Sequence, residues 1–599
     1  MNEELIHPKE LAFQLYEVLD TESLLSRSRF EEHNRETFDA ILETANKIAM
    51  EKFANHNALA DADEPKFDGK NVHMIPQVKE AFDAYSEAGF MAGRYDFEEG
   101  GMQLPESIMM ACSGYFMAAN PSSAGYPFLT VAAANVIRNF ADESLKEKFM
   151  PRMLTGEFTG TMALTEPHAG SSLADIRTSA AKADDGSYRL KGSKLYISAG
   201  EHQLSNNIVH LVLAKIHGAP AGVKGISLFI VPKYRLDESG QPGERNDVAL
   251  AGLIHKMGYR GTTSTALSFG ENDDCHGYLV GEEHHGLKYM FLMMNEARIG
   301  VGFGAAMIGY SGYQYSLAYA KDRTQGRVPP KNSPNDPATA IINHGDVKRM
   351  LLAQKSYVEG AMSLCLYAAR LVDDINTLEN ESERRMTEEL LDLLTPVVKA
   401  WPSEFGVKAN DLAIQVLGGA GYTREYPVEQ CWRDNRLNPI HEGTNGIQAL
   451  DLLMRKLWQA KGAGLQTLLS RVMADFSNAK GPECQKLIKK TQKYLAELQP
   501  LIPELGNAMR DEKVMVLLAN AQCFMNVFSS VVMSWIWIRQ ANVAEQALEH
   551  CEDADKHYYL GKIQAAKYYV NWELPLIQRD LDVLNEFDAS CCDMQADWF

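Results

Sequence analysis

The sequence changes character at Leu164-Thr165-Glu166-Pro167-His168-Ala169-Gly170-Ser171-Ser172. Before this stretch, apolar residues recur at helical spacing through residues 36–160. After it, short runs rich in β-branched residues and bounded by Gly and Pro predict strands at residues 208–216, 226–231 and 265–269. The stretch offers hydroxyls and backbone N–H groups to a planar ligand, although taken alone it is an ordinary turn. Helices followed by strands predict separate helical and β domains.

Within the β region, residues 188–190 and 194–198 flank a Lys-Gly pair, which predicts a β-hairpin. Together with the other strands, this pattern predicts an antiparallel domain that ends near Gly281. Helical spacing returns at residue 287 and continues to about residue 457, with a polar loop at 326–343. Helices therefore flank the β region on both sides along the chain.

The predicted fold class is a multidomain α+β protein. Its parts are an N-terminal extension, an N-terminal helical domain, a central antiparallel β-domain, a C-terminal helical bundle and an additional C-terminal helical domain, at residues 1–35, 36–160, 161–283, 284–460 and 465–599. The sequence Lys461-Gly462-Ala463-Gly464 between the last two parts is a plausible linker.

The chain has 599 residues, a net charge of −20 and nine cysteines. The negative charge argues against nucleic acid as a partner, because binding it needs basic surface. No cysteine pair has C-x-x-C spacing, so neither a metal site nor a disulfide framework is predicted. The acidic N-terminus lacks the basic and apolar regions of a secretory signal. These features predict a reduced compartment and a cytoplasmic location.

One segment is long enough to span a bilayer, since residues 514–538 contain no charged side chain. Its polar side chains are a heavy load for lipid, so we favour a buried bundle helix and predict no membrane span. These side chains belong to Asn520, Gln522, Asn526, Ser529, Ser530 and Ser534.

A glycine-rich motif occurs at Gly300-Val301-Gly302-Phe303-Gly304. It lacks the full G-x-G-x-x-G spacing of a dinucleotide fingerprint, and no strand precedes it. Close helix packing is therefore the favoured interpretation of these glycines.

Eight segments occur in the order in which the acyl-CoA dehydrogenase family carries them, and on these the chain resembles that family. They are residues 165–171 (TEPHAGS), 196–200 (YISAG), 294–298 (MNEAR), 322–326 (DRTQG), 415–422 (QVLGGAGY), 425–429 (EYPVE), 433–434 (RD) and 441–444 (HEGT). The additional C-terminal block resembles that of the larger bacterial members, which include fatty acyl-CoA and 3-methylmercaptopropionyl-CoA dehydrogenases.

The resemblance implies FAD, bound between the β-domain and the C-terminal helices. It assigns cofactor contacts to Met162, Leu164, Thr165, Gly170, Ser171, Tyr196, Ser198, Arg323, Gln325, His344, Gln415, Gly418, Gly419 and Thr444. In the family, the segments that contain Arg323 and Gln415 reach the FAD of a neighbouring subunit, which implies a homodimer.

The resemblance also implies that Glu442 is the catalytic base, in the sequence Ile440-His441-Glu442-Gly443-Thr444-Asn445-Gly446-Ile447-Gln448. It would remove the α-proton of an acyl-CoA while FAD accepts the β-hydride, giving a trans-2-enoyl-CoA. Electrons would then pass to an electron-transfer flavoprotein. The substrate-binding positions implied by the match are Ser171, Asn295, Arg298 and Gly443.

Some family members place the base immediately before the arginine of the earlier helix. Ala297 occupies that position here and cannot act, and a slip of one residue turns Glu296 about 100° away on a helix. Glu296 is therefore expected to be structural.

This chain departs from the family pattern at Gly446, where many members carry a glutamine, at His441, and in a longer loop at residues 328–342. His441 is either a neutral packing residue, which we favour, or a group that tunes Glu442. Two other functions share the fold: an acyl-CoA oxidase that reduces oxygen, and a non-catalytic, DNA-associated flavoprotein.

Overall fold

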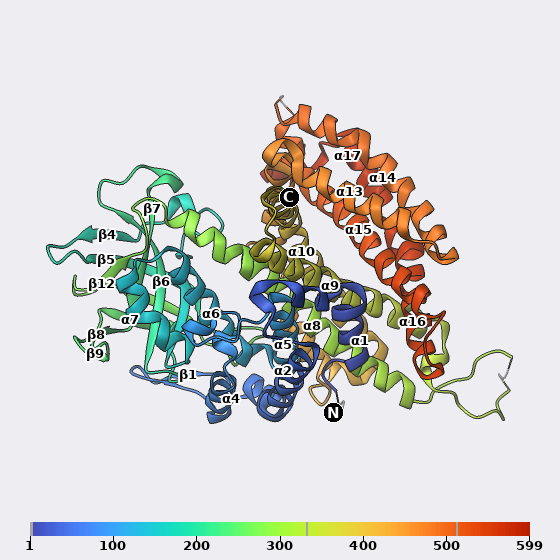
Figure 1. Ribbon diagram of the computed structural model, residues 1–599, viewed down its shortest axis with the longest axis horizontal. Coiled ribbons are helices and arrows are strands. Elements are labelled where there is room, and N and C mark those ends of the chain that lie inside the picture. Colours follow the sequence, from blue (N-terminus) through green and yellow to red (C-terminus); the bar gives the residue numbers. More distant parts are fainter. Residues whose placement is uncertain (1–3, 331–332, 511–512) are drawn as a thin grey trace. The chain divides into compact units, whose positions relative to one another are not determined.

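The computed structural model describes residues 4–330, 333–510 and 513–599 and contains two compact units. We call Arg35–Ala297 the N-terminal unit, and Met1–Asn34 together with Arg298–Phe599 the C-terminal unit. Residues 1–3 of the predicted N-terminal extension, and residues 331–332 of the long loop at 328–342, lie outside the described residues. Figure 1 labels the main elements of both units.

The N-terminal unit begins with helices, as predicted. They are α2 (Arg35–Ile48), α3 (Asn57–Ala62), α4 (Pro76–Glu87), α5 (Glu106–Ala119), α6 (Pro121–Phe140) and α7 (Glu143–Leu154). The start of α6 is fixed locally, because the Asn120 side chain accepts a hydrogen bond from the Ser123 N–H and Pro121 occupies the first turn. Asp142 caps α7 in the same way through the Leu145 N–H.

An eight-stranded sheet follows, in the order β10-β11-β5-β12-β7-β6-β3, with β4 paired to β5 and β6. Its strands are β3 (Phe158–Ala163), β4 (Ser179–Lys182), β5 (Tyr188–Ser198), β6 (Asn207–Ile216), β7 (Ile226–Pro232), β10 (Val248–Leu253), β11 (Ser264–Phe269) and β12 (His276–Leu279). Two-stranded ribbons are formed by β1 (Lys66–Phe67) with β2 (Val72–His73) and by β8 (Tyr234–Leu236) with β9 (Pro242–Arg245).

The central β-domain is confirmed, but its sheet is mixed and not wholly antiparallel. Strand β6 is parallel to both β3 and β4, whereas the other pairs are antiparallel. Strand β3 is followed by β4 and β5 before the chain returns as β6, and a connection of that length permits parallel pairing. The sequence pattern alone did not reveal β3, which begins inside the range predicted to be helical.

The predicted hairpin at residues 188–198 is wrong, because β5 is one continuous strand through this range. Gly192 does not form a turn; it pairs with Phe269 of β11. A Cβ atom at Gly192 would lie 2.8 Å from the Cα of Thr178. The glycine therefore serves the close approach of a neighbouring segment.

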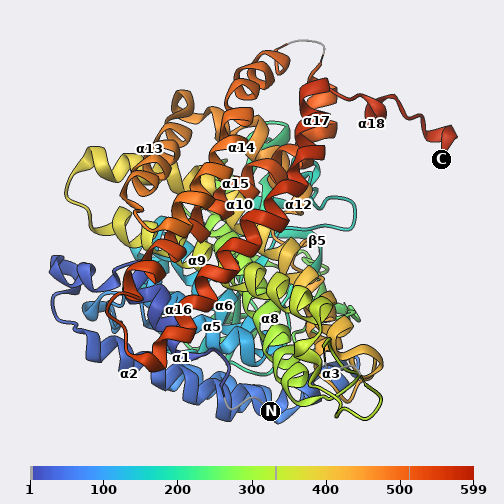
Figure 2. The ribbon, with the colours of Figure 1, turned by 90° about the vertical axis from the view of Figure 1, so that its right-hand side faces the viewer.

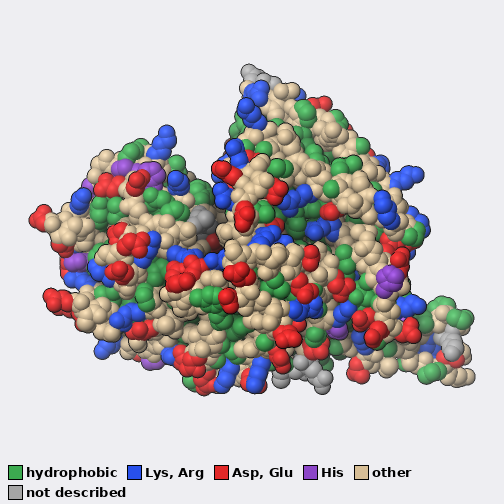
Figure 3. Space-filling view, viewed as in Figure 1, with side chains coloured by type: hydrophobic (Ala, Val, Ile, Leu, Met, Phe, Trp, Pro, Cys, Tyr) green, Lys and Arg blue, Asp and Glu red, His purple; other side chains and the backbone are tan. Residues whose placement is uncertain are grey.

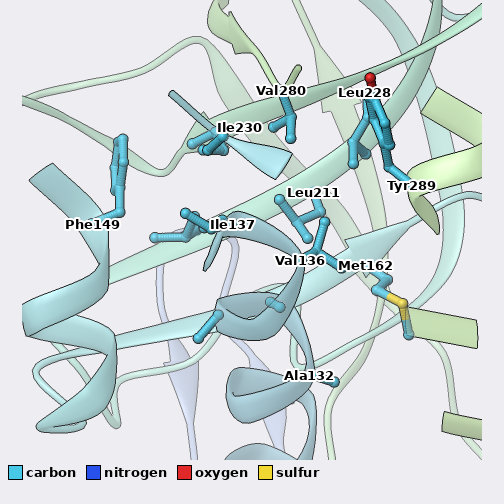
Figure 4. Close-up of a cluster of buried hydrophobic side chains, with 14 of the residues drawn as sticks. Ala132, Val136, Ile137, Phe149, Met162, Leu211, Leu228, Ile230, Val280 and Tyr289 are labelled. Atoms are coloured by element: carbon cyan, nitrogen blue, oxygen red, sulfur yellow. The ribbon is translucent and has the colours of Figure 1, made fainter. Parts of the chain in front are cut away.

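Helix α6 covers the sheet through an apolar interface, shown in Figure 4. Val136 and Ile137 of α6 point toward Leu211 of β6 and Ile230 of β7, and all four side chains are buried. Phe149 of α7 extends the same cluster. Burial of this kind stabilises a fold by roughly 25 cal/mol per Å² of apolar surface removed from water, so it fixes the sheet that carries the predicted flavin residues.

The C-terminal unit is helical, as Figures 1 and 2 show. Its helices are α1 (Pro8–Ala12), α9 (Gly345–Thr377), α10 (Glu381–Leu417), α11 (Val428–Asn435), α12 (Asn445–Met454), α13 (Ala463–Asn478), α14 (Pro482–Ala508), α15 (Val514–Ala547), α16 (Asp553–Tyr568), α17 (Gln578–Glu586) and α18 (Ser590–Asp593). Helix α8 (Gly286–Asp322) begins in the N-terminal unit and continues into this one. The predicted domain boundaries within the units remain predictions.

The charge-free run at residues 514–538 forms the first part of α15, which packs against α14 and α16. The helix carries buried aromatic side chains, including Trp535 and Trp537, as expected for a bundle helix. Among the described residues, α15 is also the one helix whose length and composition would suffice to cross a membrane, and just over half of its most apolar window is buried.

The glycine motif at residues 300–304 lies inside α8, and the interpretation as close helix packing is confirmed. A Cβ atom on Gly302 would lie 2.0 Å from the carbonyl oxygen of Val398 on α10. Only glycine permits backbone approach of this kind.

Candidate active site

Glu442 lies in the loop between α11 and α12, and the loop backbone is held in a less common conformation. Glu442 has φ of 51° and Gly443 has φ of 85°. The left-handed conformation is unfavourable for a residue other than glycine, so contacts around Glu442 must hold its backbone in this conformation. The loop is closed by the Asn445 N–H, which donates to the Pro439 carbonyl at 3.0 Å. Thr444, a predicted cofactor residue, instead caps α12 by accepting from the Ile447 N–H at 3.3 Å.

Gln448 of α12 supports the same loop from inside. Its Nε2 donates to the Gly443 carbonyl at 3.1 Å and to the Glu442 carbonyl at 3.4 Å. Its Oε1 is buried and has no hydrogen-bond partner in the described part of the chain. The backbone N–H groups of Glu442 and Gly443 are likewise not donors to any described residue. The loop therefore presents unused donors beside the carboxylate.

The Glu442 side chain is half-buried, and its charge is only partly compensated. Burial raises the pKa of its carboxyl above the ordinary value, while the positive charges of Arg298 and Lys399 oppose that rise. A carboxylate with a raised pKa is a stronger base than one in water. The carboxylate is therefore suited to accept a proton.

Arg298, a predicted substrate-side residue, is buried on α8. Its Nη1 donates to Asp451 Oδ2 of α12 at 3.0 Å, and its Nε has no partner among the described residues. A Cβ atom added to Gly443 would lie 3.8 Å from Arg298 Nη2. The structure thus brings Arg298 to the loop of Glu442.

Lys399 was missed by the sequence reasoning. It is fully buried on α10, and its Nζ donates to Asn445 Oδ1 at 3.2 Å. Burial lowers the pKa of its ammonium to about 7, with Glu442 raising it and Arg298 lowering it further. The available signal was a single cation within the apolar run at residues 395–401 (TPVVKAW).

His441 is neutral at physiological pH. Burial lowers the pKa of its imidazole to about 3, and the charge of Lys399 lowers it further. Its Nε2 lies 3.1 Å from Asn438 Oδ1. These contacts agree with the favoured interpretation of His441 as a packing residue.

In the N-terminal unit, the 164–172 loop is tied to β5 near the predicted flavin residues. The Leu195 N–H donates to the Thr165 carbonyl at 2.9 Å. Glu166 is buried and forms an ion pair of 2.9 Å with the buried Lys194. Its carboxylate also accepts from the N–H groups of Arg177 and Thr178, at 2.7 and 3.0 Å. A charge-assisted network therefore fixes this loop.

Next to that network the sheet presents surface for a planar ligand. Tyr196 is 61% exposed and has a φ of 59°, and Ser198 two residues further on is also exposed. Gly170 and Ser171 are exposed on the loop, and a Cβ atom on Gly170 would meet nothing within 4 Å. Met162 and Leu164 instead belong to the apolar core or pack against it.

Asn295 and Glu296 of α8 lie in the N-terminal unit. Glu296 Oε1 accepts a hydrogen bond of 2.6 Å from Asn135, which agrees with a structural role. Asn295 Oδ1 is buried and without a partner among the described residues, so it is available to a ligand.

The remaining predicted cofactor residues form two exposed groups in the C-terminal unit. Arg323 and Gln325 follow α8, and His344 Nε2 lies 2.7 Å from the Gln325 carbonyl. Gln415, Gly418 and Gly419 are exposed at the end of α10, where nothing lies within 4 Å of a Cβ atom added to either glycine. Within the described residues, no hydrogen bond or ion pair joins either group to Glu442.

The described residues include no group of three His, Cys, Asp or Glu side chains that could hold a metal ion. Glu442 with its two cations lies in the C-terminal unit, and the exposed hydroxyl and glycine surface at residues 165–198 lies in the N-terminal unit. Exposed glycine backbone, an aromatic face and short hydroxyl side chains fit the phosphates and ring of a flavin nucleotide.

The sequence matches four domain descriptions of one family. The N-terminal, middle and C-terminal domains of acyl-CoA dehydrogenase match residues 35–157, 161–271 and 284–457, and an "acetyl-CoA dehydrogenase C-terminal like" domain matches residues 468–595. The chain belongs to the acyl-CoA dehydrogenase family of FAD-dependent oxidoreductases.

Relatives in this family match most of the chain. It is 34% identical to a butyryl-CoA dehydrogenase of Syntrophomonas wolfei over 99% of both chains. It is 38% identical to the 3-methylmercaptopropionyl-CoA dehydrogenase of Ruegeria pomeroyi over 71% of both chains. The fold is similar to that of an acyl-CoA dehydrogenase from Bacillus anthracis solved with FAD, at a TM-score of 0.68 and 20% identity, covering 93% of this chain and 92% of the other.

Proposed function

We propose that this enzyme removes the α-proton of an acyl-CoA thioester with Glu442 and forms a trans-2-enoyl-CoA. The observation that carries this proposal is the Glu442 loop, in which a partly desolvated carboxylate is fixed by left-handed backbone and flanked by Arg298 and Lys399. FAD bound at the site would accept the β-hydride and pass the electrons on to an electron-transfer flavoprotein.

The α C–H of a thioester is a weak acid, so its removal needs both a base and stabilisation of the developing enolate. Glu442 supplies the base, because burial raises the pKa of its carboxyl. Its backbone N–H is not used by any described residue and can donate to the thioester oxygen. A donor placed where charge develops stabilises the transition state more than the substrate. The N–H of Gly443, next to it, is likewise not used by any described residue.

Several residues proposed to hold FAD lie in the N-terminal unit. Thr165, Gly170, Ser171, Tyr196 and Ser198 offer the ring a face and hydroxyl donors, and their loop is fixed by the Glu166–Lys194 ion pair. Met162 and Leu164, buried or half-buried beneath them, support this surface.

A homodimer is part of the proposal. Arg323, Gln325 and His344 form one exposed polar group, while Gln415, Gly418 and Gly419 form another at the end of α10. An arginine and open glycine backbone suit the pyrophosphate of a cofactor bound in a neighbouring subunit. Sedimentation of the holoenzyme would test the dimer.

The proposed substrates are a fatty acyl-CoA or 3-methylmercaptopropionyl-CoA, in a cytoplasmic enzyme. The names of the two sequence relatives, one acting on butyryl-CoA and one on 3-methylmercaptopropionyl-CoA, support a short acyl chain. Nucleic acid is not a proposed partner: the net charge is −20, and acidic and basic side chains are interspersed over the face shown in Figure 3.

The test is the variant Glu442→Gln, purified with FAD and mixed anaerobically with a panel of acyl-CoA thioesters. The variant should keep FAD absorbance but lose flavin bleaching by at least about a hundredfold, the usual contribution of a positioned base. Glu296→Gln is the matched control and should still bleach. A Glu442→Gln enzyme that bleaches at the wild-type rate would remove Glu442 from the mechanism, and peroxide formation without an added acceptor would indicate an oxidase.

A further inference from the structure

Lys399 is a buried cation that forms no ion pair in the described part of the chain. Its side chain is fully buried on α10, and its one recorded acceptor is the neutral amide oxygen of Asn445, at 3.2 Å. Burying an ammonium without a carboxylate partner is unfavourable, because the lost hydration of the charge is not replaced. The other buried lysines near the unit's core are paired: Lys456 with Asp392, and Lys562 with Glu10 and Glu359. Lys399 therefore needs an explanation of its own.

Glu442 is the acidic group that interacts with Lys399 electrostatically. The second cation at Glu442, Arg298, already has a carboxylate partner in Asp451. Most other charged groups on α11, α12 and the intervening loop have partners: Glu429 with Arg433, Asp434 with Gln430, Arg455 with Asp451 and Lys456 with Asp392. His441 is neutral. Arg436 of the loop has a buried Nη1 without a hydrogen-bond partner among the described residues, but the cations that act on the Glu442 carboxyl are Arg298 and Lys399. Of the two cations that act on the Glu442 carboxyl, Lys399 is therefore the one without an ion pair in the described part of the chain.

Asn445 links Lys399 to the backbone of the loop. Its Oδ1 accepts from Lys399 and, at 3.3 Å, from Ser403 one turn further along α10. Its Nδ2 donates to the Ala400 carbonyl at 3.4 Å, and its backbone N–H closes the loop on Pro439. Three contacts from α10 therefore converge on the residue that fixes the loop conformation at Glu442.

We propose that Lys399 is a positioning residue for Glu442: its ammonium keeps the carboxylate ionised and, through Asn445, holds the loop that presents it. This inference rests on the proposed function of Glu442. The pKa of Lys399, lowered by burial to about 7, places its proton loss near physiological pH. Once Lys399 is neutral, one of the two charges that oppose the raised pKa of Glu442 is gone.

The test compares three substitutions at one position in the FAD-loaded enzyme. Lys399→Met removes the charge and the hydrogen bond, Lys399→Gln removes the charge but can still bond to Asn445, and Lys399→Arg keeps the charge. Lys408→Met is the control, because Lys408 lies on the same helix with 49% exposure and pairs with Glu404. The first measurement is kcat/KM as a function of pH. The second is an infrared titration of the carboxylic-acid band of Glu442, which is assigned by its absence from the spectrum of Glu442→Gln.

The apparent pKa on the acidic side of the kcat/KM profile should rise by about 1 to 3 units in Lys399→Met and Lys399→Gln. This is the range expected when a carboxylate loses a neighbouring opposite charge. On that side of the profile each unit is roughly a tenfold loss of activity, which recovers at higher pH. The infrared titration should shift equally. Lys399→Arg and Lys408→Met should keep the apparent pKa of the wild-type profile. If Lys399→Met does not fold, Lys399→Gln still reports the effect of removing the charge.

Two results would overturn the inference: neutral variants that bind FAD and titrate like the wild type, or an apparent pKa for Lys399→Arg that moves as far as that of Lys399→Met. Failure of the proposed function is distinguishable, because it would appear as an active Glu442→Gln enzyme whatever happens at Lys399.

Discussion

The N-terminal segment of the chain is attached to the last helices by a buried ion network, and removing Lys562 should release it. Lys562 on α16 is fully buried and donates to Glu10 Oε1 at 2.5 Å, Glu359 Oε2 at 2.8 Å and Gln540 Oε1 at 3.2 Å. Glu10 belongs to α1 and Glu359 to α9. One ammonium therefore joins segments that are far apart in the sequence.

The magnitude follows from the charges. Two buried carboxylates, Glu10 and Glu359, are balanced by two lysines, Lys562 and Lys355, the latter 2.5 Å from Glu359. Burial opposes the charge of Glu359, yet the two lysines lower the pKa of its carboxyl overall. Lys562→Met would leave one ammonium for two carboxylates. Removing one partner of a buried pair typically costs about 3–5 kcal/mol, and we expect a loss in that range.

Two measurements on the full-length protein test this: the urea midpoint for unfolding of the C-terminal unit, and hydrogen exchange of the backbone amides at residues 8–18. Lys562→Met should lower the midpoint and expose the amides of the N-terminal segment, while Lys556→Met, an exposed lysine on the same helix, should change neither. A Glu10→Gln and Lys562→Met cycle should be non-additive by at least about 1 kcal/mol. A Lys562→Met protein within about 0.5 kcal/mol of the wild type, with the segment still protected, would refute the reasoning.

Two further changes test packing. His210 of β6 is fully buried, neither ring nitrogen has a partner among the described residues, and burial lowers its pKa to about 3. The folded imidazole therefore cannot take up the proton that the unfolded chain binds below pH 6.5, so the stability of the protein falls as the pH is lowered from 6.5 toward 3. His210→Leu should stabilise the protein by about 1 kcal/mol at pH 7 and should reduce this loss of stability at low pH. Thermal unfolding at a series of pH values measures both effects. Gly302→Ala should destabilise by about 1–3 kcal/mol or more, because its Cβ would meet the Val398 carbonyl at 2.0 Å; an unchanged midpoint of unfolding would contradict the contact.

The sequence pattern predicted the order of helical and β regions because helical and strand spacing differ in period. The prediction of individual strands failed where the same residue type, glycine, occurs both in turns and at close contacts within a strand. Gly192 resembles a turn residue but permits close approach of Thr178 within a strand. Strand β3 escaped notice because all six of its residues are buried, so it shows no alternation.

For the site, the motif match supplied residues that are expected to face a ligand, such as Tyr196 and Ser198, both of which are exposed. It did not supply residues that act from within the protein. Lys399 carries no motif, and its significance depends on its electrostatic coupling to Glu442 and on its lack of an ion pair among the described residues, which only the three-dimensional structure reveals. The same holds for Lys562, whose partners Glu10 and Glu359 are hundreds of positions away along the chain.

The glycine motif in α8 connects helix packing to the chemistry of Glu442. Gly302 lies four residues after Arg298, so the two occupy the same face of the helix. That face meets α10 at Val398, the residue immediately before Lys399. Close approach at Gly302 therefore fixes the distance between the helices that carry the two cations beside Glu442. A larger residue there would separate Arg298 from Lys399, so we expect these glycines, which superficially suggest a nucleotide loop, to help set the charge around Glu442, the proposed base.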